Sequence, residues 1–202
     1  MQWLVVVVAL VPAVAFAEPE SASERESPLS HPAVAIDGGV VGFIDNDLRA
    51  LVRPGEVWGA RVVFGSHEDI RIEVTYAGSH QALDPTAGEG LVSHGTRGVL
   101  RINVAPWLNT VEPFLYFGTG WSRYHVQGRM PGSPLQTNDN VLEIPFGIGV
   151  AKRIGGFSLD VRAGLEVASG GDLLPIPMPP HSSRTSASMD RYLAAAVFGY
   201  EI

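Results

Sequence analysis

The chain has 202 residues, a net charge of -7, a pI near 5.3 and no cysteine. This acidic balance excludes nucleic acid as a partner, because phosphate backbones require a basic face. A small exported domain without disulfides needs a good core or a closed hydrogen-bonded sheet, and the 23 glycines favour sheet and tight turns over helices.

Residues 1–17 have the character of a secretory signal peptide. No charged residue interrupts the run from Trp3 to Ala17, and small residues at its end supply a processing site. The run is too short for a membrane-spanning helix, and no later stretch is long enough. Residues 18–34 are polar, acidic and proline-containing, which predicts a flexible periplasmic leader ahead of a barrel domain at 35–202.

Eight segments of the remaining chain have the character of strands. Their connections alternate between short and long, which is typical of an outer-membrane barrel with short periplasmic turns and longer outer loops. An even number of strands places both termini on the periplasmic side. We expect strands at 35–44, 57–65, 69–78, 97–106, 112–126, 140–153, 156–168 and 189–201, with long loops at 45–56, 79–96, 127–139 and 169–188.

The segment Phe157 to Ala168 shows the alternation most clearly. Leu159 and Val161 belong to an uncharged row, whereas Asp160 and Arg162 belong to the opposite row. Because successive side chains of a strand point to opposite faces, one face is apolar and the other is charged. We predict that the apolar face contacts lipid and that the charged face lines the bore.

Alternation alone also fits a soluble barrel whose apolar row points inward. Glycines and aromatic residues favour the membrane barrel. Six glycines fall in the charged row, where a narrow bore has little room: Gly118, Gly120, Gly147, Gly149, Gly164 and Gly199. Aromatic residues near the strand ends predict two interfacial girdles, formed by Trp58, Tyr76, Trp121 and Tyr192 toward the outer surface and by Phe64, Phe157 and Tyr200 toward the periplasm.

The predicted bore carries as many acidic as basic residues. Isolated buried ions are costly, so balanced signs predict a salt-bridged and largely closed lumen. A narrow or gated ion pathway is the alternative, whereas an open diffusion pore needs about 16 strands. The lumen charges are Asp37, Arg61, Arg71, Glu73, Arg97, Arg101, Glu143, Arg153, Asp160, Arg162, Glu166 and Glu201.

Two segments carry a resemblance to a known family. Residues 112–121, E-P-F-L-Y-F-G-T-G-W, and the closing residues 192–202 resemble the small eight-stranded outer-membrane β-barrel family, the OmpA-type transmembrane domain. The resemblance implies an all-β, eight-stranded, antiparallel up-and-down barrel in a Gram-negative outer membrane. It also implies outer-membrane lipids as surroundings and recognition of the last strand by the barrel assembly machinery. The family usually ends on Phe, whereas this chain ends on Ile202 after Phe198 and Tyr200.

These patterns predict a protein without catalytic centre, cofactor or metal, in a structural, envelope-integrity or surface-interaction role. The proline-rich residues 172–180 of the last loop are a candidate surface for a partner. Two other functions stay open: a soluble exported ligand-binding barrel, and a lipid acyl hydrolase on the same barrel. The hydrolase would use residues at the outer rim, although adjacent Ser-His residues lie on opposite faces of a strand: Ser79, His80, Ser93, His94, Ser122 and His125. Rim histidines including His181 have no metal-ligand spacing.

Overall fold

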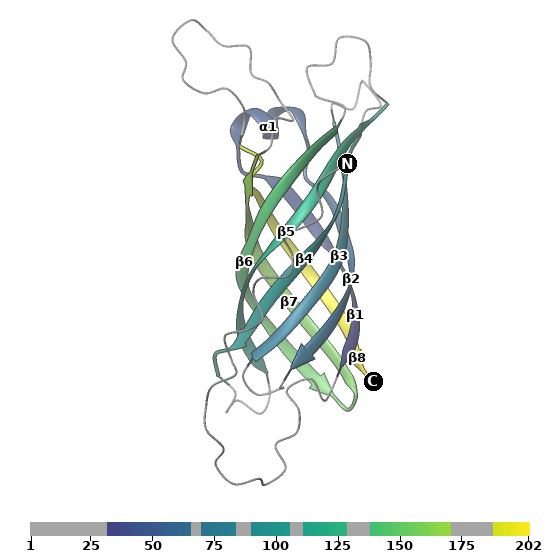
Figure 1. Cartoon of the computed structure of the whole chain (residues 1–202), viewed down its shortest axis with the longest axis vertical. Coiled ribbons are helices and arrows are strands. Elements are labelled where there is room, and N and C mark those ends of the chain that lie inside the picture. The colour runs from purple at the N-terminus through teal and green to yellow at the C-terminus, as the bar shows by residue number, and fades with distance from the viewer. Residues whose placement is uncertain (1–31, 66–69, 84–89, 106–110, 129–137, 171–187) are drawn as a thin grey trace, which may run out of the picture.

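The chain forms one closed barrel of eight antiparallel strands in sequence order (Figure 1). This computed structural model describes residues 32–65, 70–83, 90–105, 111–128, 138–170 and 188–202. Each strand pairs with the next, and the last pairs with the first, which confirms the predicted fold class. The strands are β1 (Ala33–Phe43), β2 (Gly55–Gly65), β3 (Ile70–Ala82), β4 (Gly90–Asn103), β5 (Glu112–Gln127), β6 (Asn138–Ile154), β7 (Phe157–Ser169) and β8 (Arg191–Glu201).

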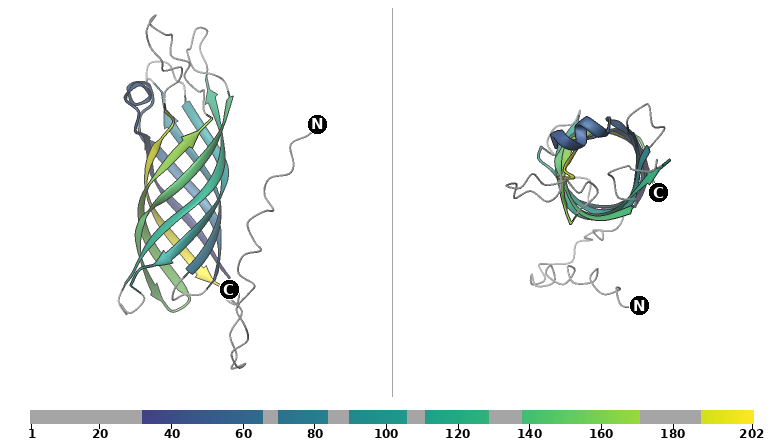
Figure 2. Two further views of the ribbon diagram at one scale, coloured as in Figure 1. Left: turned by 60° about the vertical axis from the view of Figure 1, so that its left-hand side comes forward. Right: turned by 90° about the horizontal axis from the view of Figure 1, so that it is seen from above.

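The two ends of the barrel differ in what lies over them. At the terminal end Ala33 pairs with Glu201, and at the loop end Phe43 pairs with Arg191. Helix α1 (Asn46–Leu51) stands at the loop end, and the C-terminus lies at the opposite end (Figures 1 and 2). Within the described ranges, no helix is long and apolar enough to cross a membrane.

The outer wall of the barrel is apolar and the inner wall is polar. Leu159, Val161 and Leu165 are 54%, 61% and 40% exposed, whereas Asp160 and Arg162 between them are buried. The same alternation runs through the other strands. An apolar outer wall requires an apolar environment, so the orientation of this row excludes the soluble ligand-binding barrel.

Aromatic side chains gather at two levels of the outer wall. Trp58 and Tyr76 approach each other with ring centroids 6.0 Å apart toward the loop end, and Trp121 and Tyr192 are also exposed there. Toward the terminal end, Phe157 lies 5.0 Å from Tyr200 between ring centroids. Phe64, the remaining predicted girdle residue, is partly exposed. These positions are the ones that interfacial anchoring requires.

The turn between β6 and β7 shows why the sequence uses two glycines there. Ile154 pairs with Phe157, so Gly155 and Gly156 alone make the connection. Gly155 has a φ of +61°, a left-handed conformation that two-residue hairpin turns require and that glycine adopts without steric cost. This connection is one of the short turns that the sequence predicts.

Two of the predicted long loops are shorter than expected. The predicted loop 79–96 is wrong at both ends, because β3 continues to Ala82 and β4 already begins at Gly90. In these extensions backbone hydrogen bonds define the strand, while the polar side chains of His80 and His94 interrupt the apolar outward row. The predicted loop 45–56 contains α1, which Asp45 caps by accepting hydrogen bonds from the backbone N–H groups of Asp47 and Leu48.

Candidate functional site

The bore of the barrel is the candidate site, because charged side chains of all eight strands meet there. All twelve lumen charges named from the sequence lie on the inner side of the wall, and Glu112 and Arg191 join them. The resulting set holds seven arginines and seven carboxylates: Arg61, Arg71, Arg97, Arg101, Arg153, Arg162, Arg191, Asp37, Glu73, Glu112, Glu143, Asp160, Glu166 and Glu201.

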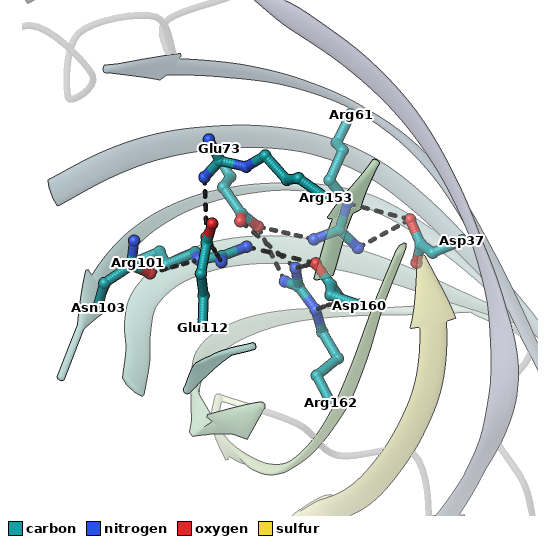
Figure 3. A network of polar contacts seen from close by, with 9 residues as sticks. All are labelled: Asp37, Arg61, Glu73, Arg101, Asn103, Glu112, Arg153, Asp160 and Arg162. Carbon is teal, nitrogen blue, oxygen red and sulfur yellow. Dashed lines mark hydrogen bonds and ion pairs between the residues drawn. The ribbon is translucent and has the colours of Figure 1, made fainter. Parts of the chain in front are cut away.

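Halfway along the bore, five of these residues form a central network (Figure 3). Glu73 accepts hydrogen bonds from Arg61 at 2.7 Å and from Arg162 at 2.8 Å. Arg61 also contacts Asp37 at 2.8 Å, and Arg162 donates two hydrogen bonds to Asp160, from Nε at 3.0 Å and Nη2 at 2.7 Å. The network therefore connects β1, β2, β3 and β7 across the bore. Paired charges in this geometry satisfy one another without water.

Toward the terminal end, a second group of charges extends the central network. Arg101 lies 3.5 Å from Asp160 and 3.6 Å from Glu112, so it links the two groups (Figure 3). Arg153 donates a hydrogen bond to Glu112 at 2.8 Å and lies 3.8 Å from Glu201. Glu112, Arg153 and Glu201 are partly exposed, which is consistent with a gradual opening of this end to water.

Toward the loop end, Arg97, Glu143, Glu166 and Arg191 form what we call the upper network. Arg191 donates to Glu143 at 2.7 Å and to Glu166 at 2.6 Å. Arg97 pairs with Glu166 and lies 3.6 Å from Glu143. Arg191, Glu143 and Glu166 are each 1% exposed. Two cations thus hold two carboxylates in a space that is closed to solvent.

Neutral groups complete the coordination of Glu143. Ser122 donates its hydroxyl to one carboxylate oxygen at 2.7 Å, and Tyr124 donates to the other at 2.8 Å. The Arg191 guanidinium also lies over the Tyr124 ring, 5.2 Å from its centroid. A buried carboxylate that accepts several hydrogen bonds and two ion pairs has no remaining need for water.

An apolar lid lies directly above the upper network. Tyr124 belongs to both, because its hydroxyl binds Glu143 while its ring packs into the lid. Leu48 of α1 is fully buried in this cluster, so the helix is held down on the end of the barrel. The lid consists of Phe43, Leu48, Val52, Leu83, Leu91, Tyr124, Val126, Val141 and Met189.

A small void lies between the central and upper networks. This cavity of about 30 Å³ is bounded by side chains of both, including Arg61, Arg97 and Arg162. Since a buried water needs about 10 to 15 Å³ of such space, the cavity has room for about two waters, which is too little for a continuous water column. With the lid above it, the bore is a filled core.

Aromatic rings of β5 fill the remaining space by lying against glycines of the neighbouring strands β6 and β7. Phe114 occupies the place that a side chain at Gly149 would take, and the Tyr116 hydroxyl does the same at Gly147 and Gly164. The Arg101 guanidinium lies 3.8 Å from the centroid of the Phe114 ring, which adds a cation–π contact. Three of the six glycines predicted to make room in the bore, Gly147, Gly149 and Gly164, therefore receive aromatic side chains of β5.

Replacing Gly164 by Ala tests this packing. The added methyl group would overlap the Tyr116 hydroxyl and crowd the Phe146 carbonyl, so we expect a loss of about 1 to 3 kcal/mol in unfolding free energy. Urea unfolding in detergent micelles, followed as a gel-mobility shift, measures it. Gly98→Ala is the matched control, because its methyl group meets nothing within 4 Å. Equal stabilities of the two variants would contradict the packing.

Glu112 and Arg191, which the sequence analysis did not include among the lumen charges, also occupy inward positions of their strands. Glu112 shares its face with Phe114 and Tyr116, and Arg191 shares its face with Glu201. Each stands at the first position of the observed strand. Both lie within the predicted strands 112–126 and 189–201, so carrying the alternation to the ends of those strands would have identified them.

The residues of the hydrolase alternative lie on opposite sides of the barrel wall. Ser79 and Ser122 are buried in the bore, where they contact Ser93 and Glu143, whereas His80 and His125 point outward. The backbone of the barrel wall lies between the inward serines and the outward histidines, so these residues do not form a nucleophile–base pair. His181 and the proline-rich residues 172–180 lie outside the described residues. Across the described ranges, no three His, Asp or Glu side chains are grouped as metal ligands.

A closed antiparallel barrel with an apolar outer wall and an ion-paired bore is a small transmembrane β-barrel, the class that includes the eight-stranded outer-membrane proteins. Among solved structures, the chain is similar to Neisserial surface protein A (NspA), with a TM-score of 0.60 and 14% identity over 85% of this chain and 97% of NspA. It also matches OprG from Pseudomonas aeruginosa (TM-score 0.47, 10% identity, 84% and 95% coverage). A third match is the outer-membrane enzyme PagL (TM-score 0.42, 13% identity, 84% and 99% coverage). At these identities the likeness concerns the fold alone. No family model and no curated protein sequence matches the chain.

Proposed function

We propose that the chain is a non-enzymatic outer-membrane β-barrel with a closed lumen, and that it serves a structural, envelope-integrity or surface-interaction role. The observation that carries this proposal is the bore itself, in which ion-paired side chains lie under an apolar lid. A transport pathway needs continuous water or a ladder of exposed ligands, and an enzyme needs an accessible reacting group. The filled bore favours neither.

The same proposal includes the orientation and the surroundings of the barrel. A signal peptide at residues 1–17 would deliver the chain across the inner membrane, so the terminal end would face the periplasm and the loop end the outside. The closing strand β8 would be read by the barrel assembly machinery. Partners would then be met at the loop end, where connections 84–89, 129–137 and 171–187 lie between strands.

Single-channel recording and cell fractionation test this proposal together. The refolded chain, which should migrate differently on a gel before and after boiling, should leave a planar lipid bilayer at its background conductance because the bore has no water column. In cells the protein should sediment with the outer membrane. Stepwise conductance from gel-verified folded protein would contradict the closed lumen, and recovery in the soluble fraction would contradict the membrane assignment.

A further inference from the structure

Four cationic or titratable side chains stand together on the outside of the barrel, near the loop end. We call them the outer cationic patch: His80 on β3, His94 on β4, and Arg123 and His125 on β5. Each occupies an outward position of its strand, and all but the half-buried His125 are exposed. Neither the filled bore nor the apolar wall accounts for them.

The strand register places the four side chains in two adjacent rows of the outer wall. His94 pairs directly with Arg123, and in the following row Val92 pairs with both His80 and His125. Neighbouring strands lie about 4.8 Å apart and alternate residues on one strand about 7 Å apart, so the patch has the dimensions of one lipid headgroup. Asn140 follows Arg123 in the first row, and Asn138 follows His125 in the second.

The level of the patch on the wall matches the headgroup layer of a membrane. Arg123 lies two residues beyond Trp121, and His80 lies two residues beyond Gly78, which the Trp58 ring covers. Aromatic rings of this kind sit at the boundary between acyl chains and headgroups. The patch therefore stands just outside the apolar belt, where lipid phosphates lie.

The charges facing the patch favour an anion. Glu56 on β2 lies 3.8 Å from His80. Among the described residues, it is the one acidic side chain on the outer wall beside the patch. On β6, the Asp139 carboxylate accepts the Asn140 backbone N–H and belongs to the inward row of its strand. His125 shares a hydrogen bond with the Asn138 side chain at 2.9 Å, which fixes the orientation of its ring.

We propose that the outer cationic patch binds the phosphate of an anionic membrane lipid in the leaflet next to the loop end. Arg123 would bind the phosphate through its planar fork of donors, and His94 beside it would add a second donor. His80 and His125 would contact the same headgroup from the next row. The inference rests on the proposed membrane residence of the barrel.

Fluorescence quenching at Trp121 measures this binding where it occurs. In the full chain, W3F, W58F and W107F leave Trp121 as the one tryptophan, two residues from Arg123. Nanodiscs of phosphatidylcholine receive either brominated phosphatidylglycerol or brominated phosphatidylcholine. We expect phosphatidylglycerol to associate next to Trp121 about fivefold more strongly than phosphatidylcholine. One basic side chain near an anionic lipid provides a preference of about this size.

The variants decide between a local site and general attraction to the barrel. In H94Q/R123Q the preference should fall to about one, whereas K152Q, which removes an exposed outward charge near the terminal end, should leave it unchanged. The boiling-dependent gel shift verifies that each variant is folded and embedded, so a failure of membrane residence is recognised separately. Equal quenching by the two lipids in the folded parent, or an undiminished preference in H94Q/R123Q, would overturn the proposal.

Discussion

Replacing Glu73 by Gln should lower the unfolding free energy of the barrel by about 3 to 5 kcal/mol. Glu73 is 1% exposed and is the carboxylate that joins Arg61 to Arg162. The neutral amide keeps the size of the side chain but removes the carboxylate that Arg61 and Arg162 share, and it leaves seven arginines against six carboxylates in the bore. Breaking a buried ion pair from one side is costly, because the remaining charge has neither partner nor water.

Urea unfolding in lipid vesicles measures the loss, and Glu56→Gln provides the matched control. Glu56 undergoes the same chemical change on the outer wall, where it is exposed and faces His80 at 3.8 Å. We expect the control to change the unfolding free energy by less than about 0.5 kcal/mol. A Glu73→Gln variant as stable as the control would mean that water reaches the centre of the bore.

The alternation of the sequence was sufficient to predict which residues face the bore. Asp160 and Arg162 stand between Leu159 and Val161, and in a strand this order permits only two orientations. In water the charged row would face outward, whereas in lipid the charged row would face the bore. The glycines opposite Phe114 and Tyr116 select the second, because a narrow ion-filled bore needs them and a soluble apolar core does not.

The partners within the bore could not be predicted in the same way. Arg162 binds Glu73, which precedes it by 89 residues, and Arg97 binds Glu166, which follows it by 69. Both contacts depend on the register of several strands and on the tilt of the barrel, and no local pattern encodes either. The sequence therefore predicts that charges are balanced and buried but leaves open which charge meets which.

The loop end was the least predictable region for a related reason. The extensions of β3 and β4 carry His80 and His94 outward and Ser79 and Ser93 inward, while Leu91 and Val92 fall on opposite faces, so apolar and polar residues mix on both. Hydrophobic periodicity is weak in such a mixture, although the backbone ladder continues. The position of the outer cationic patch became visible only with the strand register.

Replacing Arg191 by Met should destabilise the loop end of the barrel by about 3 to 5 kcal/mol. Arg191 is 1% exposed and binds both Glu143 and Glu166, so its loss leaves Arg97 alone with two buried carboxylates. Arg191 also begins β8 and pairs with Phe43 of β1, where the barrel closes on itself. We expect the loss to appear first as faster hydrogen exchange along this part of the β1–β8 seam.

A second variant separates the charge imbalance from the loss of packing. Adding Glu143→Gln to Arg191→Met restores one cation to one carboxylate, because Arg97 and Glu166 remain paired. If uncompensated charge causes the loss, the double variant should recover about 1 to 2 kcal/mol of unfolding free energy and part of the exchange protection, although Glu143→Gln alone should destabilise the barrel. The opposite outcome is a double variant that is less stable than R191M by as much as E143Q alone destabilises the parent. In that case Arg191 contributes through packing, namely its contact with the Tyr124 ring at 5.2 Å and with the apolar lid above it.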